Sequence, residues 1–295
     1  MFPIIPANSV AEEAGNSEGI FGFGYAGGSL SMTNLVSNAG VVSSDVAGVG
    51  TGRNLLGACE YGGDKGIFGF GSGDLNITNL VSNAGVVSTD VAGVGTGRGY
   101  IAACSYGGDK GIFGFGYSTV GGGSNLTNLV SNVGVVSTDV AGVGTARDNL
   151  AACEFGGDQG IFGFGSTGPQ PYPDMTNLVS NTGVVASDVS VVGTAREALA
   201  ACSYGEDKGI FGYGNKGSGA TNLVSNTGVV SSDVAGVGTS RAYLSATQYD
   251  EDKGIFGYGH SALSMTNLVS NAGVVGTDVT GVGTGRYGLD ACSFN

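Results

Sequence analysis

The sequence of 295 residues contains no tryptophan, a single histidine and only 11 basic side chains against 24 acidic ones. With one histidine, a His-rich metal centre or a catalytic triad has almost no candidates. The shortage of Lys and Arg argues against nucleic acid as a partner, because phosphate binding needs clustered basic side chains. No uninterrupted apolar run reaches the roughly 18 residues of a membrane-spanning helix, so we expect no membrane span.

Proline is scarce and glycine is abundant, with 5 and 59 residues respectively. A mainly helical protein is excluded, because glycine inside a helix costs about 1 kcal/mol relative to alanine. Glycine at this level approaches the composition of disordered low-complexity chains. The positions of the glycines, however, are not random.

Three phrases recur six times along the chain, at spacings of roughly 47 residues. GIFG begins at Gly19, Gly66, Gly111, Gly160, Gly209 and Gly254. TNLVSN begins at Thr33, Thr78, Thr127, Thr176, Thr221 and Thr266. The third phrase ends in Arg53, Arg98, Arg147, Arg196, Arg241 and Arg286. Six near-identical units therefore cover almost the whole chain.

The unit that begins at Leu150 shows the expected strands. Two short runs, LAACEF and GIFGFG, flank the turn GGDQ, and Phe162 and Phe164 share one face of the second run. After a loop of variable length, TNLVS and the Val-rich VVASDVSVVG flank a turn at Gly183. We therefore predict an all-β fold with four short antiparallel strands per unit, as in propeller blades.

Arg98, followed by YIAACSYGGDKGIFGFG at Tyr100–Gly116, resembles a repeat of the kelch-type propellers. Two features depart from that family: the paired glycines after the second strand are reduced, and the tryptophan near the fourth strand is missing. The wording of the units is also similar to that in tail or fibre proteins of bacterial viruses. The resemblance covers residues 18–295 and implies a six-bladed β-propeller, on a virion or another extracellular appendage.

The ends of the chain predict how such a ring closes. The sequence begins in mid-unit, with residues 19–24 as a second strand, and ends with Leu289–Phe294 as a first strand. We expect these two strands to pair and to remove an open sheet edge. One domain, residues 18–295, then follows an N-terminal arm, residues 1–17. An open β-solenoid is the alternative.

Five cysteines occupy the same position of the first run, and Thr247 takes it in the remaining unit. Equivalent positions of neighbouring blades lie too far apart for disulfides. We interpret them as small buried residues, with a ring of thiols binding a soft metal as the alternative. The cysteines are Cys59, Cys104, Cys153, Cys202 and Cys292.

In every unit an aspartate precedes the arginine by eight residues. A catalytic site is not repeated six times in one small ring, so we interpret these residues as a structural pair or a loop-capping contact. A ring of Ca²⁺ ligands is the alternative; otherwise we expect no metal and no cofactor. The pairs are Asp45 and Arg53, Asp90 and Arg98, Asp139 and Arg147, Asp188 and Arg196, Asp233 and Arg241, and Asp278 and Arg286.

Turns and loops differ in how much they vary between units. The turns between strands one and two and between strands three and four are nearly constant, and antiparallel strands place them on one rim, the uniform rim. The loops between strands two and three and the links after each arginine vary, and they form the opposite, variable rim. Variable loops on a rigid scaffold are typical of binding sites, although neutral drift is the alternative. The candidate ligand-binding residues are Tyr25, Asp74, Tyr117, Tyr172, Lys216, His260 and Tyr287.

Residues 1–17 match no part of the repeat and lack the features of a standard secretory signal. The apolar start MFPIIP suggests that this arm docks on its own ring, on a neighbouring copy or in a larger assembly. Two sequons, at Asn76 and Asn125, lie in variable loops and matter only in a glycosylating pathway.

These observations favour a non-enzymatic structural and recognition module that binds a surface glycan or protein through its variable rim, as in a viral tail fibre. The alternative is a subunit that assembles into filaments or stacked rings through residues 1–17. A propeller enzyme is the third hypothesis. We predict no catalytic residues, because glycosidases need two placed carboxylates and copper oxidases need several histidines.

Overall fold

The computed structural model of the chain describes residues 17–215 and 219–294, and every regular element in these ranges is a β-strand. The strands form small antiparallel sheets, one for each repeat unit, together with a two-stranded ribbon of β8 (Tyr117–Ser118) and β9 (Gly122–Gly123). The all-β class predicted from the repeat is confirmed. Neither described range contains a helix long and apolar enough to cross a membrane.

The three main strands of each sheet follow the predicted runs. The inner strands are β3 (Gly57–Tyr61), β6 (Ala102–Tyr106), β11 (Ala151–Phe155), β15 (Ala200–Tyr204), β18 (Ser245–Tyr249) and β21 (Asp290–Phe294). The middle strands are β4 (Lys65–Gly71), β7 (Lys110–Gly114), β12 (Gln159–Gly163), β16 (Lys208–Gly212), β19 (Lys253–Gly259) and β1 (Glu18–Gly22). The outer strands are β5 (Leu75–Val81), β10 (Thr127–Val130), β13 (Met175–Val179), β17 (Thr221–Val224), β20 (Leu263–Val269) and β2 (Thr33–Val36).

The two ends of the chain share one sheet, in the order β2-β1-β21. Strand β21 pairs with β1 in an antiparallel register that places Glu18 opposite Phe294 and Gly22 opposite Asp290. The predicted pairing of the strand at the end of the sequence with the first GIFG strand is therefore confirmed.

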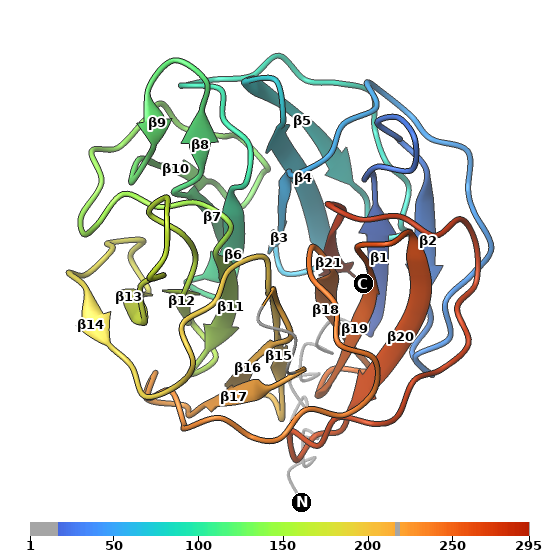
Figure 1. Cartoon of the computed structure of the whole chain (residues 1–295). Coiled ribbons are helices and arrows are strands. Elements are labelled where there is room, and N and C mark those ends of the chain that lie inside the picture. The colour runs from blue at the N-terminus through green and yellow to red at the C-terminus, as the bar shows by residue number, and fades with distance from the viewer. Residues whose placement is uncertain (1–16, 216–218, 295) are drawn as a thin grey trace, which may run out of the picture.

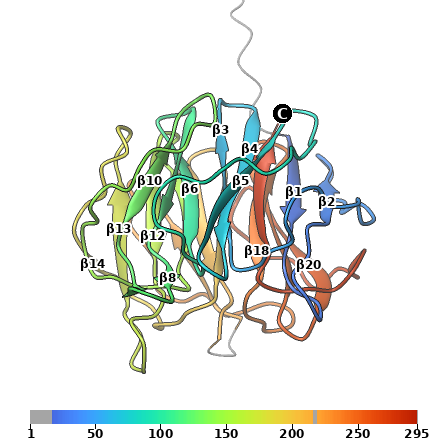
Figure 2. The same cartoon turned by 90° about the horizontal axis from the view of Figure 1, so that it is seen from above.

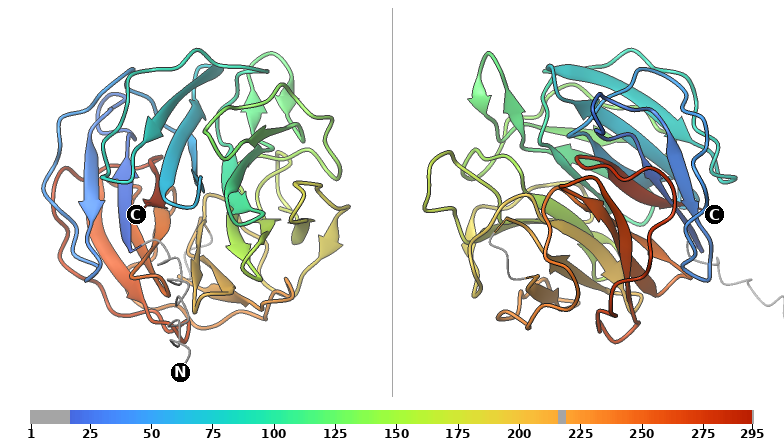
Figure 3. Two further views of the ribbon diagram at one scale, coloured as in Figure 1. Left: turned by 180° about the vertical axis from the view of Figure 1, so that it is seen from behind. Right: turned by 45° about the vertical axis from the view of Figure 1, so that its right-hand side comes forward.

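The six sheets surround a common centre, with their inner strands toward it (Figure 1). The inner strands contact one another in the order β3, β6, β11, β15, β18, β21 and back to β3. Figure 2 shows the molecule from the side, with the strands running between two rims, and Figure 3 shows the same arrangement from behind and obliquely.

The prediction of four strands in every unit is wrong for five of the six sheets. Only the sheet of β11 has a fourth strand, β14 (Val189–Ser190); elsewhere the Val-rich run makes isolated bridges such as Thr33–Val46. In the sheet of β11 the next pair, Met175 and Ser190, extends the Thr176–Val189 bridge into a strand. In other units side chains also bond this part of the backbone; for example, Ser43 Oγ accepts from the Leu35 N–H at 2.8 Å. Backbone groups bonded to side chains cannot continue a regular strand.

The core lies between neighbouring sheets, where large side chains meet glycines. The Phe68 ring faces Gly22 of the next sheet so closely that a Cβ on Gly22 would lie 2.6 Å from its Cζ. The same ring packs edge-to-face on Phe23, with 5.1 Å between the centroids. This fit repeats around the molecule, with Phe113 facing Gly69 and Phe162 facing Gly114. The glycines thus set the spacing of packed sheets.

All five cysteines are buried and unpaired, as predicted. Each Sγ faces a glycine in the middle strand of a neighbouring sheet; Cys59, for example, faces Gly111. In the sixth unit Thr247 faces Gly19 in the same way. Burial raises the pKa of the Cys202 thiol to about 12, so this thiol stays protonated at neutral pH.

The six arginines are buried and bind the backbone. Arg98 is representative: its Nε–H donates to the Phe115 carbonyl at 2.7 Å and its Nη2 donates to Asn128 Oδ1 at 2.6 Å. Its guanidinium also lies over the Phe70 ring, 4.8 Å from the centroid. Burial lowers the pKa of Arg98 to about 10, and Asp139 partly offsets that effect.

Pairing of each arginine with the aspartate eight residues before it is wrong, because the ion pairs join neighbouring units. The aspartate of one unit also accepts from the threonine before the arginine of the preceding unit; Asp90 Oδ2, for example, accepts from Thr51 Oγ1 at 2.7 Å. Asp45 closes the series by accepting from Thr284 Oγ1 at 2.7 Å. The ion pairs, at 3.8–4.0 Å, are Arg53–Asp90, Arg98–Asp139, Arg147–Asp188, Arg196–Asp233 and Arg241–Asp278.

Candidate functional site

The residue two positions after each arginine belongs to a closed belt of backbone hydrogen bonds at the centre of the molecule. Each N–H of the belt donates to the carbonyl of the equivalent residue in the preceding unit, at 2.6–3.1 Å, and Leu55 donates to Gly288. All six residues have φ between 54° and 61°, a conformation that costs non-glycine residues roughly 1–2 kcal/mol. The belt consists of Leu55, Tyr100, Asn149, Ala198, Tyr243 and Gly288.

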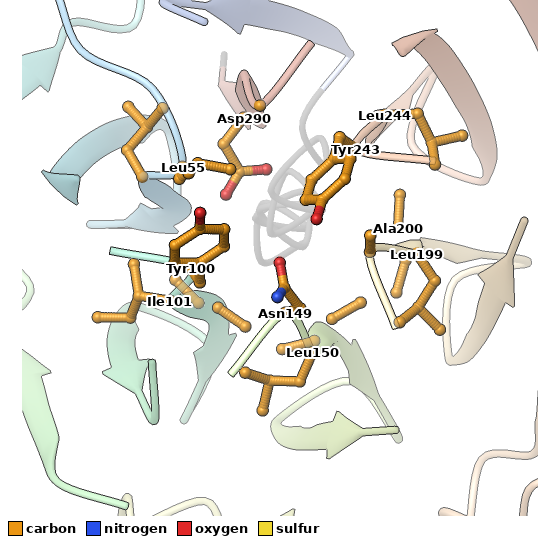
Figure 4. Close-up of a pocket in the computed structure, with 18 of the residues that line it drawn as sticks. Leu55, Tyr100, Ile101, Asn149, Leu150, Leu199, Ala200, Tyr243, Leu244 and Asp290 are labelled. Atoms are coloured by element: carbon orange, nitrogen blue, oxygen red, sulfur yellow. The ribbon is translucent and has the colours of Figure 1, made fainter. Parts of the chain in front are cut away.

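This belt surrounds the mouth of a central cavity on the variable rim, which we call the mouth cavity. Its volume is about 80 Å³. Tyr100, Asn149 and Tyr243 point toward its middle, and Asp290 lies at its edge (Figure 4). Its deeper wall contains alanines of the inner strands, such as Ala102 and Ala151.

A cluster of aromatic rings stands beside the mouth. The rings of Tyr25 and Tyr287 lie 5.4 Å apart between centroids, and those of His260 and Tyr287 lie 5.2 Å apart. Tyr243 links this cluster to the belt, at 6.3 Å from Tyr287. Three of the predicted candidates, from both ends of the chain, thus come together.

Two carboxylates lie next to the belt and share an amide. Asn149 Nδ2 donates to Asp148 Oδ1 at 2.8 Å and to Glu197 Oε2 at 3.4 Å. Burial, with a smaller contribution from Glu197, raises the pKa of Asp148 to about 6. Burial, together with the nearby acidic groups, also raises the pKa of Tyr243 to about 12, so its hydroxyl remains neutral.

Asp290 is the carboxylate that lines the edge of the mouth cavity. It accepts from Ser245 Oγ at 2.7 Å and from the Ala291 N–H at 2.9 Å. Burial raises its pKa to about 7 despite these hydrogen bonds. The other five units have glycine, alanine or serine at this position.

The remaining candidates make contacts of their own in the variable loops. Asp74 accepts from both the N–H and the hydroxyl of Thr119, and these hydrogen bonds hold the variable loops of two units together. Tyr117 is exposed, and its backbone pairs with Gly99. Asn215 Nδ2 donates to the Tyr172 hydroxyl at 3.1 Å. Lys216 lies outside the described residues.

Each rim is formed by the loops or turns that were predicted for it. Bridges between Tyr25 and Tyr287 and between Gly99 and Tyr117 join the variable loops to the links after arginine. On the opposite rim, Asn132 Nδ2 donates to Asp109 Oδ2 at 3.0 Å, which joins the two kinds of constant turn. The sequon side chains serve the fold, because Asn76 Nδ2 donates to the Gly95 carbonyl and Asn125 Nδ2 to the Gly144 carbonyl, each at 2.8 Å.

Tyr100, Asn149, Tyr243 and Asp290 are site residues that the sequence pattern had not singled out. A signal existed for the first three, because the second position after each arginine varies while an apolar Leu or Ile always follows it. For Asp290 the signal was a single charged residue at an otherwise small position.

The described residues contain no group of three or more His, Cys, Asp or Glu side chains arranged to hold a metal ion. The repeated aspartates already have donors: Asp90 Oδ1 accepts from Asn79 Nδ2 at 2.9 Å and lies 3.9 Å from Arg53 Nη1. A Ca²⁺ ion there would have to displace these partners.

Comparison with protein-family models and with curated proteins found no match for this chain.

Proposed function

We propose that the six sheets are the blades of a closed, kelch-like β-propeller. The closed belt of six backbone hydrogen bonds, the cyclic contacts of the inner strands and the β1–β21 pairing support this. A closed ring leaves no inner sheet edge free for pairing with another chain.

We further propose that this propeller is a non-enzymatic recognition module that binds a glycan through its variable rim, in a viral tail fibre or another extracellular appendage. The observation that carries the proposal is the aromatic cluster of Tyr25, His260 and Tyr287, which Tyr243 links to a cavity of about 80 Å³. Aromatic rings offer flat apolar faces, and nearby carboxylates accept hydrogen bonds from hydroxyl groups. That combination suits a sugar ring.

The mouth cavity is concave and is lined by a few polar groups, as sites for small ligands are. Catalysis has weak support, because His260 Nδ1 lies 3.5 Å from Ser261 Oγ, outside the usual reach for proton abstraction.

A glycan array tests the proposal. The parent protein should bind a defined set of glycans, and Tyr287→Ala and His260→Ala should each weaken that binding at least about tenfold. Tyr117→Ala and Tyr172→Ala test the outlying candidates. Lys65→Ala on the uniform rim is the control and should bind as the parent does. A folded parent protein that binds no glycan would contradict the proposal.

Self-assembly is a second candidate function, favoured by the outer wall. Each unit exposes valines there; Val41 and Val86, for example, are 64% and 65% exposed. Val46, Val49 and Val86 line an apolar groove of about 220 Å³ between two units. Contiguous exposed apolar surface is typical of interaction sites. Residues 1–16 of the arm lie outside the described residues. Electron microscopy of the protein with and without residues 1–17 tests whether it assembles into filaments or stacked rings and whether the arm is needed.

A further inference from the structure

Charge on the variable rim is of one sign wherever the structure describes it. The six arginines are at most 4% exposed. Lys65, Lys110, Lys208 and Lys253 lie in the turns that form the uniform rim, each in an ion pair with an aspartate. Asp148 and Glu197 at the belt therefore have no cationic partner among the described residues of this rim. Lys216, in a variable loop of the same rim, lies outside the described residues. A ligand that supplies a positive charge would be attracted by the two carboxylates.

The mouth cavity has the size and the lining for a small cation. About 80 Å³ is room for several water-sized groups. The side chains of Tyr100 and Tyr243 enter it from two different links, with Asn149 between them and Asp290 at the edge (Figure 4). Tyrosine rings attract cations through the negative face of the ring, and a nearby carboxylate adds a direct charge interaction.

The carboxylates around this cavity are held in an environment that disfavours their charge. The pKa of Asp148 rises to about 6 and that of Asp290 to about 7, chiefly through burial. An ammonium group placed nearby would favour the ionised form of these carboxylates, which a neutral group cannot do.

We propose that the mouth cavity binds the protonated amino group of an amino sugar, which enters between Tyr100 and Tyr243 toward Asp290, while Asp148 and Glu197, both bound by Asn149, lie next to the belt. This inference rests on the proposed glycan recognition and names the sugar class. The aromatic cluster of Tyr25, His260 and Tyr287 stands beside the mouth, where the next sugar ring of a chain would stack.

A matched pair of oligosaccharides tests the charge directly. Isothermal titration calorimetry at pH 7 would compare the β-1,4-linked tetramer of glucosamine with the tetramer of N-acetylglucosamine, which has the same backbone and no ammonium groups. The free-amine tetramer should bind at least about tenfold more tightly, and added salt should reduce the difference. Equal affinities, or tighter binding of the acetylated tetramer, would overturn the inference while leaving glycan recognition intact.

Variants then locate the charge. Asp290→Asn and Asp148→Asn should each remove most of the preference for the free amine, about tenfold, without abolishing residual binding to the acetylated tetramer. Asp174→Asn removes the same charge from an exposed loop of the same rim and should leave the preference unchanged. A preference that survives both cavity substitutions would overturn the assignment. Thermal melting of each variant verifies folding. If Asp290→Asn misfolds, Asp148→Asn still tests the assignment, because Asp148 lies outside the packed inner strands.

A lysine-containing peptide serves as a third probe. Weaker binding of this peptide than of the glucosamine tetramer supports a sugar ligand. Tighter binding of the peptide would overturn the amino-sugar assignment in favour of a protein ligand. Failure of every glycan, on the array as well as in the titrations, would contradict the proposed function itself.

Discussion

Asp290 combines a buried carboxyl group with a position at the ligand mouth. Its pKa of about 7 lies above the roughly 3.9 of an aspartate in an unfolded chain. The folded state therefore binds this proton more tightly than the unfolded state does. The stability contributed by the group is complete below about pH 4 and is lost as the pH rises through about 7.

Replacement of Asp290 by asparagine should change stability in a pH-dependent way. Asn remains neutral, and its side-chain oxygen can still accept from Ser245 Oγ. We therefore expect Asp290→Asn to melt at a higher temperature than the parent at pH 8, by a few degrees, and at nearly the same temperature at pH 4. Circular dichroism melting curves at both pH values measure this. A variant less stable than the parent at pH 8 would contradict it; Asp174→Asn is the control for charge alone.

At the scale of elements, size complementarity between neighbouring sheets replaces a single central core. Each middle strand carries a glycine that leaves room for a cysteine of the adjacent inner strand or, at Gly19, for Thr247. At the junction of β4 and β21, a Cβ on Gly66 would overlap Cys292 Sγ, while the next nearest atom, Val81 Cβ, lies at an ordinary 3.4 Å. The sulfur therefore decides whether a side chain fits there.

The Gly66–Cys292 contact predicts a compensating pair of substitutions. Gly66→Ala should destabilise the protein by about 1–3 kcal/mol through overpacking. Cys292→Ala removes the overlapping sulfur, so the double variant Gly66→Ala/Cys292→Ala should recover a large part of that loss. Urea unfolding of the four proteins gives the coupling free energy. Additive effects of the two substitutions would show that the sulfur is not the limiting contact.

At the scale of the whole molecule, strands β1 and β21 pair without the hairpin turn that joins the inner and middle strands of the other sheets. Glu18 and Phe294 face each other in the β1–β21 register, as Lys65 and Tyr61 do across the turn Gly-Gly-Asp in the next sheet. The break in the chain is therefore at a position where each other unit has a tight turn. A closed ring would tolerate a break at another loop equally well.

A circular permutant tests ring closure. Phe294 would be joined to Glu18 by Gly-Gly-Asp, and the chain would be opened between Val120 and Gly121, at the exposed β8–β9 loop. We expect this permutant to fold and to melt within a few degrees of a protein that lacks only residues 1–17. A second permutant, opened between Ile161 and Phe162 inside β12, should be strongly destabilised. Failure of the first permutant to fold would contradict closure.

The repeat allowed most of the fold to be predicted, because periodic residues occupy equivalent environments. The glycine and phenylalanine of GIFG indicated the middle strands, and the shared cysteine position indicated burial. The fourth strand was overestimated, since valine-rich composition does not reveal that in five sheets this run makes only isolated bridges with the outer strand. The aspartate partners were misassigned because sequence spacing favours contacts within a unit, whereas packing brings neighbouring units together.

By itself, the sequence determined the all-β class, the six units, the two rims and the joining of the chain ends, since local periodicity and turn residues encode these. Only the tertiary structure decided which variable residues meet. Tyr25 and Tyr287 stand 5.4 Å apart because the ends of the chain share a sheet, and Tyr100 and Tyr243 face one cavity because the belt turns their links inward. Such proximity depends on how six sheets surround one centre, which no single unit of the sequence contains.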